Sequence, residues 1–267
     1  MEITKETSYI IGLAQSDGHL SLSTRNRGRF TIELSDVDKD IIYKIAQYIP
    51  YEYSIFRRKR KTNFAKKFSG IGIRVCNQEF RKWLNRSGVP YGKKSLIVSP
   101  PLYLKGLSVD DYVRGLWDGD GSVGYTATKI PYLSFTTCSY NIKDFIENYI
   151  AQIIGNHKHH FTKPKRDSVF NIMVTKESAV LLAKKLYPVA ASNMSIKRKF
   201  INAQKVKQWQ RPCNMREITW KRSKWTKEED EYLLTNGVNS TMKHFDRTSK
   251  SVIIRLWRLS LPVNHRR

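Results

Sequence analysis

The chain has few cysteines and no long apolar run, and both scarcities exclude whole classes of protein. Its three cysteines, Cys76, Cys138 and Cys213, are odd in number and far apart. They suit neither a disulfide framework nor a zinc site, and they fit a reducing compartment. With no signal peptide, membrane-length run or basic amphipathic anchor helix, we expect no membrane partner. We expect an intracellular protein, in the cytoplasm of a bacterium or phage-infected cell or in an organelle.

Acidic residues are scarce too. There are 48 lysines and arginines against 23 acids in 267 residues, so the formal net charge is +25. An excess of this size favours a polyanionic partner, with nucleic acid as the leading candidate. Histidine offers no metal cluster, because the six histidines are scattered and His157, His159 and His160 follow a strand period.

One nonapeptide occurs twice, once in each half of the chain. The copies are Ile10–Gly18 (IIGLAQSDG) and Val113–Gly121 (VRGLWDGDG). Both have Gly at the third position, Leu at the fourth, a small residue at the seventh, Asp at the eighth and Gly at the ninth. Two copies followed by similar downstream patterns are difficult to attribute to chance.

The motif predicts two helices that cross at close range. In a helix the third and seventh positions share one face. That face carries Gly12 and Ser16 in the first copy and Gly115 and Gly119 in the second. A glycine inside a helix costs about 1 kcal/mol against alanine, so it indicates a packing requirement. We therefore expect Gly12 and Gly115 to pack at the seam between the helices.

The eighth position then falls at the C-terminal end of each helix. Crossing helices would bring Asp17 and Asp120 together, and Gly18 and Gly121 suit a left-handed helix stop. Two neighbouring carboxylates repel each other unless a cation lies near them. Carboxylate oxygens without a Cys/His cluster indicate Mg²⁺. Phosphodiester hydrolysis uses such a metal to activate water and neutralise phosphate charge.

Hydrophobic periodicity predicts the order helix, two strands, helix, two strands, helix, twice over. Ser108 and Asp111 are predicted to form a capping box at the start of the second motif helix. The fold class predicted is α+β, with two pseudo-symmetric αββαββα halves, 1–100 and 101–210, whose antiparallel sheets form a saddle. The expected strands are about 19–25, 29–35, 53–58, 71–75, 122–128, 132–138, 157–163 and 168–174, and the expected helices after the motifs are about 38–48, 77–87, 141–154, 177–187 and 193–209.

The saddle is expected to present basic side chains to DNA. A two-stranded ribbon fits the major groove, where base pairs are distinguishable. For any single arginine the alternative is a solvated surface charge. The candidate DNA contacts are Arg25, Arg27, Arg29, Arg57, Arg58 and Arg74.

A linker over 211–224 leads to a different segment, 225–267. It has 8 basic and 5 acidic residues, so +22 of the net charge lies on the rest of the chain. Three helices are predicted, about 227–235, 240–245 and 249–260, with a turn before the last, as in a helix-turn-helix. Thr226 and Glu229 are a second capping box. The last helix should bury Val252, Ile253, Leu256 and Leu259 and leave Lys250, Arg255 and Arg258 available for DNA.

The opening Trp225–Asp230 of this segment resembles Myb/SANT-like domains, and Arg247–Val252 resembles the start of their recognition helix. The resemblance implies a small all-α, DNA-binding module. The alternative is a helical cap that packs on the core.

At its two nonapeptides, and over about residues 5–205, the sequence resembles the single-chain LAGLIDADG homing endonucleases. The first copy departs at the sixth position, where Gln15 replaces the usual acid. The resemblance implies that Asp17 and Asp120 are catalytic and bind metal, with the carbonyls of Ser16 and Gly119 sharing the coordination.

The resemblance also implies a basic helper in each half and a polar, water-ordering residue at the end of the second strand. The matching helpers are Lys94 (or its neighbour Lys93) and Lys197 or Lys199, and the matching polar residues are Ser35 and Ser139.

These inferences predict a monomeric, Mg²⁺-dependent endonuclease that cuts both strands of a long, non-palindromic DNA target. An intron maturase that binds RNA stays open, because groove-facing arginines serve both functions. A non-cleaving DNA-binding regulator is a third possibility, and the aspartate in both copies argues against it.

Overall fold

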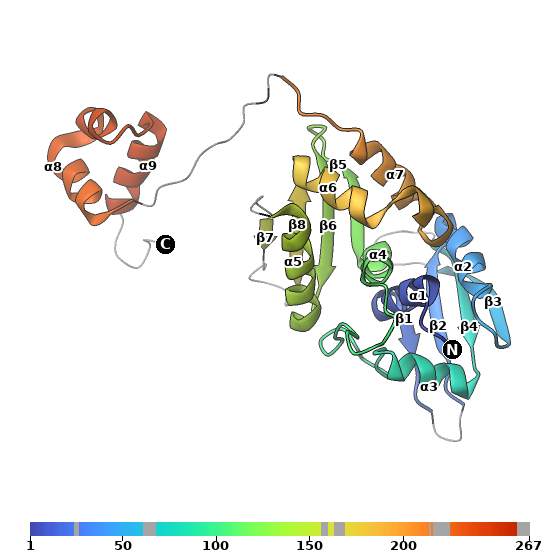
Figure 1. Ribbon diagram of the computed structural model, residues 1–267. Coiled ribbons are helices and arrows are strands. Elements are labelled where there is room, and N and C mark those ends of the chain that lie inside the picture. Colours follow the sequence, from blue (N-terminus) through green and yellow to red (C-terminus); the bar gives the residue numbers. More distant parts are fainter. Residues whose placement is uncertain are drawn as a thin grey trace. The chain divides into compact units, whose positions relative to one another are not determined.

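The computed structural model describes residues 1–23, 27–60, 68–155, 160–162, 169–213, 215 and 225–260. The chain forms two compact units, Met1–Pro212 and Cys213–Arg267 (Figure 1). The first unit contains two halves with the same order of elements, and the second is helical. The predicted α+β class, with two repeated halves and a helical C-terminal region, is therefore confirmed.

The first half begins with the first motif helix, whose N-terminus is capped by Thr4 in a reciprocal capping box with Thr7. Its elements are α1 (Lys5–Ser16), β1 (Gly18–Leu20), β2 (Phe30–Ser35), the 3-10 helix η2 (Asp36–Asp38), α2 (Lys39–Ala46), β3 (Tyr53–Arg60), β4 (Phe68–Val75) and α3 (Gln78–Arg86).

The second half repeats the order helix, two strands, helix, two strands, helix, and then adds a 3-10 helix and a further α-helix. Its elements are α4 (Val109–Asp120), β5 (Gly121–Tyr125), β6 (Pro131–Thr137), α5 (Tyr140–Ile154), β7 (His160–Thr162), β8 (Phe170–Thr175), α6 (Lys176–Leu186), the 3-10 helix η3 (Val189–Met194) and α7 (Lys197–Lys207).

Each half contains a four-stranded antiparallel sheet, with the equivalent orders β1-β2-β4-β3 and β5-β6-β8-β7. The motif helices α1 and α4 lie side by side between the two sheets (Figure 1). Alternate residues of β2 and β6 are buried, so one face of each sheet packs on helices and the other stays open.

The hydrophobic core consists of two clusters, one for each half, and each cluster takes residues from the other half. Met194, the last residue of η3, and Ile196, the N-cap of α7, are buried in the first half's cluster. Ile11 of α1 and Val98, which precedes α4, belong to the second half's cluster. The two halves therefore share their cores within one unit.

Several predicted boundaries were wrong. The first strand ends at Leu20, and the helix expected over 193–209 is divided at Ser195, which is extended (φ −154°, ψ 152°). Ser108 is the N-cap of α4 but makes no capping hydrogen bond. Its hydroxyl donates instead to the Asp111 carboxylate (2.5 Å), and its N–H donates to the Ser8 hydroxyl of α1 (3.1 Å).

The C-terminal unit contains α8 (Lys227–His244) and α9 (Ser249–Ser260). Gly237 (φ 74°, ψ −178°) interrupts α8, so two helical segments precede the last helix, as predicted. The capping box of Thr226 and Glu229 is present. Of the four apolar residues expected on the buried face of α9, Val252 is buried, whereas Ile253 is 53% exposed.

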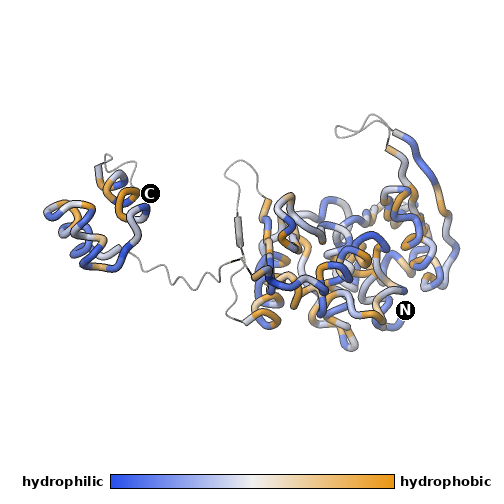
Figure 2. Tube along the Cα trace, turned by 90° about the horizontal axis from the view of Figure 1, so that it is seen from above, coloured by the Kyte–Doolittle hydropathy of each residue, from blue (hydrophilic) through white to orange (hydrophobic). Residues whose placement is uncertain are grey.

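Hydrophobic stretches along the chain are short and interrupted by hydrophilic ones (Figure 2). Among the described residues, no helix is long and apolar enough to span a membrane.

Candidate functional site

The seam between α1 and α4 is a direct contact between two backbones. A Cβ at Gly12 would lie 2.1 Å from the carbonyl oxygen of Tyr112, and one at Gly115 would lie 2.2 Å from that of Tyr9. Real Cβ atoms do not approach so closely, so only glycine fits at these two positions. The structure thus places Gly12 and Gly115 at equivalent points of the crossing.

The ninth residue of each motif does not form the predicted left-handed stop. Gly121 is extended (φ −103°, ψ 173°), and Gly18 does not have a positive φ. Crowding is the reason for glycine here. A Cβ at Gly18 would lie 2.5 Å from the Ala14 carbonyl oxygen, and one at Gly121 would lie 2.4 Å from the Trp117 ring.

Asp17 and Asp120 lie at the C-terminal ends of the two crossing helices, Asp17 as the C-cap of α1 and Asp120 as the last residue of α4. Both residues are exposed to solvent. Surrounding protein still desolvates them. Desolvation, followed by the Asp17 charge, raises the pKa of Asp120 to about 6, and desolvation raises the pKa of Asp17. The Asp17 charge acts on Asp120, and Asp17 Oδ2 would lie only 3.1 Å from a Cβ built on Gly119, the residue before Asp120, so the fold brings the two carboxylates close to each other.

Lys94 is bonded to the end of the first motif helix. Its amine donates to the carbonyl oxygens of Ala14 (3.0 Å) and Ser16 (2.6 Å). Burial lowers the pKa of Lys94 to about 8, and the charges of Asp120 and Asp17 oppose that shift. The amine therefore lies in the field of both carboxylates, whereas its neighbour Lys93 is exposed.

Lys199 is the equivalent lysine of the second half. Its side chain is 3% exposed. Its amine donates to the carbonyl oxygens of Trp117 (3.0 Å), Asp118 (2.5 Å), Gly119 (3.4 Å) and Gly121 (2.6 Å). Burial lowers its pKa.

Lys197 is exposed at the start of α7, two residues before Lys199. Residues two apart on a helix point to different sides. Of the two lysines predicted as the basic helper of the second half, the fold therefore brings Lys199, and not Lys197, to the paired carboxylates.

The residues around the carboxylates can accept a divalent cation. Among the described residues, no group of three or more His, Cys, Asp and Glu could enclose a metal. Mg²⁺ needs no such cage, because it is commonly held by one or two carboxylates with waters and substrate phosphates. Gly119 leaves room beside Asp17, since a Cβ there would lie 3.1 Å from Asp17 Oδ2. The carbonyls of Ser16 and Gly119 already accept from the lysines and keep a second lone pair each.

The open face of the first sheet is charged. Register places Arg74 opposite Thr31 and Ser54, and Arg58 opposite Gly70. The Arg74 guanidinium lies 5.0 Å from the centre of the Phe56 ring, and that of Arg58 lies 5.7 Å from it. Arg74 Nε and Thr31 Oγ1 are buried, with no hydrogen-bond partner among the described residues.

Strands β5, β6 and β8 of the second sheet present a neutral open face. They present hydroxyl, amide and thioether side chains on the face opposite the core. The Ser122 and Ser134 hydroxyls are hydrogen-bonded across the β5–β6 pair (2.8 Å). The other open-face residues of these strands are Gly124, Tyr132, Thr136, Asn171, Met173 and Thr175.

Register also corrects one predicted DNA contact. Arg57 pairs with Ile71, whose side chain is in the core, so Arg57 lies on the helix-covered face, where it is 3.6 Å from Asp36. Its neighbour Arg58 points the other way and lies 3.6 Å from Glu33. Arg27 and Arg29 are exposed before β2, and Arg25 lies outside the described residues.

The C-terminal unit uses its arginines partly for its own packing. Arg255, predicted to be available for DNA, forms a bidentate ion pair with Asp230. Arg247 pairs with Glu229 (2.7 and 2.8 Å) and lies 4.2 Å from the Trp225 ring centre. Lys250 and Arg258 are exposed on α9.

The two serines predicted to order water lie in different environments. Ser139 is fully buried, accepts from the Ile142 N–H and donates to the Val98 carbonyl (2.6 Å). Ser139 therefore caps helix α5, and its buried hydroxyl cannot order a water molecule at the DNA-facing surface. Ser35 lines a depression at the end of β2 together with Asp36, Val37, Lys39, Phe68 and Ser69.

No protein-family model and no curated protein sequence matches the chain. The similar solved structures include the homing endonuclease I-WcaI bound to its DNA recognition sequence, 15% identical with a TM-score of 0.48 over 73% of this chain and 85% of that one. I-SmaMI bound to uncleaved DNA with calcium ions is 11% identical, with a TM-score of 0.46 over 75% and 88%. The N-terminal LAGLIDADG domain of DUF199/WhiA is 13% identical, with a TM-score of 0.43 over 76% and 86%.

Sequence reasoning missed a set of buried polar residues behind the carboxylates. Gln15 (4% exposed) and Asp118 (1% exposed) occupy the sixth position of the two motifs. Tyr9 and Tyr112 immediately precede the motifs and are fully buried. The sequence did contain a sign of these residues, because a tyrosine stands immediately before each copy of the motif.

Arg114, in the second motif, was also missed. It is 3% exposed and donates to the carbonyl oxygens of Met194 (3.0 Å) and Leu186 (3.3 Å), and it pairs with Asp111. It therefore anchors both ends of the segment that leads from α6 to α7.

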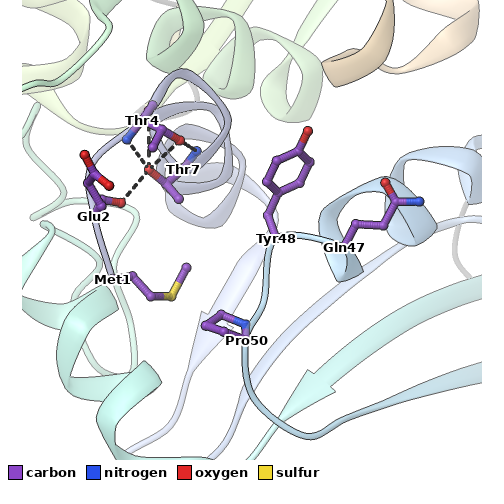
Figure 3. A pocket seen from close by; sticks show the side chains of 7 residues that line it. All are labelled: Met1, Glu2, Thr4, Thr7, Gln47, Tyr48 and Pro50. Carbon is purple, nitrogen blue, oxygen red and sulfur yellow. Dashed lines mark hydrogen bonds between the residues drawn. The ribbon is translucent and has the colours of Figure 1, made fainter.

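A separate pocket lies at the other end of α1, near its N-cap Thr4 (Figure 3). A 12-residue helix is about 18 Å long, so this pocket is well removed from Asp17. Its lining consists of Met1, Glu2, Thr4, Thr7, Gln47, Tyr48 and Pro50.

Proposed function

We propose that this protein is a LAGLIDADG-type homing endonuclease that cuts both strands of a specific DNA target with the help of Mg²⁺. The supporting observation is the arrangement of four charged groups at one end of the α1–α4 seam. Two aspartates, Asp17 and Asp120, end the helices, and two lysines, Lys94 and Lys199, bind the last carbonyls of the same helices. Each half thus supplies one acid and one base to a common centre.

Asp17 and Asp120 would hold the metal through their carboxylates, and the carbonyls of Ser16 and Gly119 would share its coordination. Bound Mg²⁺ supplies charge neutralisation at the phosphate and lowers the pKa of its water. Lys94, with a pKa of about 8, is mostly protonated at pH 7 and adds positive charge where the phosphate would lie. The lysine bonds also oppose the negative end of each helix dipole and hold the helix ends in place.

DNA binding is assigned to the open faces of the two sheets. The net charge of +25 supplies attraction to phosphate, and the strands carry side chains that can read base edges. The first face has arginines, and strands β5, β6 and β8 of the second have neutral polar groups, so these strands would read the two half-sites by different chemistry. A single chain with unlike halves suits a long, non-palindromic target and action as a monomer.

The C-terminal unit is proposed to be a helix-turn-helix-like module that adds DNA contacts through the exposed Lys250 and Arg258 of α9. Cys76, Cys138 and Cys213 are free thiols. We therefore propose that the protein acts in a reducing cellular compartment that contains DNA.

The test uses the DNA that flanks the gene and a random-sequence duplex as control. We expect wild-type protein to cut the flanking DNA in Mg²⁺ and not in EDTA. Asp17→Asn and Asp120→Asn should each reduce double-strand cutting by at least about 10³-fold, while Kd measured in Ca²⁺ stays within about threefold. Binding of intron RNA without DNA cleavage would instead support a maturase. Undiminished double-strand cutting by either variant would show that the site is elsewhere.

A further inference from the structure

Gln15 is bonded to both ends of the loop that carries Lys94. Its amide donates to the carbonyl oxygens of Gly88 (2.7 Å) and Ser99 (3.0 Å). Lys94 lies between these residues in the sequence, six positions after the first and five before the second. The loop is thus attached on both sides of the lysine to one side chain of α1.

Asp118 does the same in the second half. Its carboxylate accepts from the Tyr187 hydroxyl at the end of α6 (2.8 Å) and from the Ile196 N–H just before α7 (2.8 Å). Lys199 follows Ile196 by three residues, in the first turn of α7. The segment that leads to this lysine is therefore also held at two points by a sixth-position side chain.

Both side chains are also bonded across the seam. The Tyr112 hydroxyl of α4 donates to Gln15 Oε1 (2.5 Å), and the Tyr9 hydroxyl of α1 donates to Asp118 Oδ2 (2.8 Å). These bonds connect each sixth-position side chain to the opposite motif helix. The arrangement has the pseudo-two-fold symmetry of the halves although the residues differ.

The polarity of the surroundings explains why the residues differ. Gln15 faces two carbonyl acceptors and one hydroxyl donor, so it needs both a donor and an acceptor, which an amide supplies. Asp118 faces an N–H and two hydroxyls, all donors, which a carboxylate satisfies. Glutamine thus replaces the usual acid at the sixth position of the first motif because Gln15 must donate to two carbonyls as well as accept from a hydroxyl.

We propose that Gln15 and Asp118 are positioning residues, each of which holds the segment that places the lysine of its own half beside the paired aspartates, Asp17 and Asp120. Gln15 acts on Lys94, and Asp118 acts on Lys199. The effect on DNA strands rests on the proposed endonuclease function, whereas the effect on lysine placement does not.

The first test measures the reactivity of the two lysine amines with acetic anhydride, by mass spectrometry on the full chain without metal or DNA. Gln15→Glu and Gln15→Met lose both bonds to the loop, and we expect Lys94 to be acetylated about tenfold faster or more, with Lys199 unchanged. Asp118→Ala should expose Lys199 and leave Lys94 protected. Two Gln15 variants are used because the glutamate adds repulsion against the carbonyls and the methionine does not.

Two matched controls separate positioning from general loosening. Tyr112→Phe removes the bond across the seam and leaves both loop bonds, so Lys94 should stay protected. Asp118→Asn can keep all three contacts, because its oxygen accepts from Ile196 and Tyr9 while its amide donates to the Tyr187 hydroxyl. It should therefore restore the protection of Lys199 that alanine removes.

The second test resolves the two DNA strands of the target, each with its own fluorescent label. We expect Gln15→Met to slow cleavage of one strand about tenfold or more and Asp118→Ala to slow cleavage of the other, so that each variant accumulates a nicked duplex. Equal slowing of both strands, or equal acetylation of both lysines in every variant that folds, would overturn the proposal. Intact lysine selectivity in a protein that cuts no DNA would refute the endonuclease function and retain the positioning roles.

Discussion

Arg198 of α7 forms a bidentate ion pair with Asp38, which lies 160 residues earlier, at the end of η2. Arg198 Nε is 2.8 Å from Asp38 Oδ1, and Nη2 is 2.9 Å from Oδ2. The carboxylate side chain is 5% exposed and the guanidinium side chain 55%. The pair joins the second half to the first, next to the residue Lys199, and so contributes to the position of the site.

Replacement of Arg198 by methionine should destabilise the first unit by about 1–3 kcal/mol, because it leaves a buried carboxylate without its charged donors. Urea unfolding at pH 7 measures the change. Asp40→Asn is the matched control. Asp40 pairs with Lys44 one turn along α2 (3.6 Å), where the two side chains are 31% and 32% exposed, so its loss should cost less than about 0.5 kcal/mol. Equal effects of the two variants would contradict a structural role for the buried pair.

Gly12→Ala and Gly115→Ala should each lower the free energy of unfolding by about 1–3 kcal/mol or more, because the new Cβ would overlap a backbone carbonyl of the facing helix. Gly124→Ala provides the control, since its nearest contact would be an ordinary 3.6 Å. The melting temperatures of the three variants are compared with that of the wild type by thermal unfolding. Unchanged melting of both seam variants would mean that the helices do not cross there.

The Asp120→Asn variant should be more stable than wild type at pH 7.5 in EDTA. The folded protein raises the pKa of Asp120 from 3.8 to about 6, so between these values the unfolded chain loses its proton first. Wild-type stability therefore falls as pH rises from about 4 to 6, whereas the variant has no carboxylate there to titrate. We expect the difference between the proteins to be small at pH 4, to grow up to pH 6 and then to stay constant.

Added Mg²⁺ should reverse this order, because a cation stabilises the ionised form of the paired carboxylates. Wild type should gain stability with Mg²⁺ at pH 7.5 and little at pH 4.5. A variant curve that runs parallel to the wild-type curve across this range would show that Asp120 titrates normally in the fold.

Arg74→Ala should weaken binding to the target about tenfold or more, because Arg74 lies on the open sheet face with its Nε unsatisfied. Arg57→Ala is the matched control from the same sheet. It removes an equal charge from the helix-covered face and should change Kd less than about threefold. Both are measured by fluorescence anisotropy in Ca²⁺ over a salt series. Equal losses of affinity in the two variants would show that binding depends on the net charge of the protein and not on which sheet face carries the arginine.

A chain that ends at Lys221 should fold and cut DNA, because Asp17, Asp120, Lys94 and Lys199 all lie in the first unit. It should bind its target about 10²-fold more weakly, since a tethered module acts at millimolar effective concentration. Footprinting should show protection lost on one side only. Identical footprints and salt slopes for both proteins would rule out DNA binding by the C-terminal unit, and failure to fold would favour a packed cap.

Local pattern in the sequence was sufficient to predict the repeated order of helices and strands, because amphipathic periodicity reports the buried face of each element. It also placed Asp17 and Asp120 at helix ends and small residues along one helix face. These features depend on neighbours within about seven positions in the chain, and both copies of the motif carry them.

Only the tertiary structure decided which residues meet. Adjacent strand residues always point to opposite faces, but only strand register decided that Arg58, and not Arg57, lies on the open face. Helix rotation brought Lys199 to the site in place of Lys197. The bonds from Gln15 to Gly88 and from Asp118 to Ile196 join positions 73 and 78 residues apart. Hydrophobic periodicity reports which face of one helix or strand is buried, and it carries no information on contacts between elements that are far apart in the sequence. The hydrogen bonds of Gln15 and Asp118 therefore could not be predicted before the two halves were packed together.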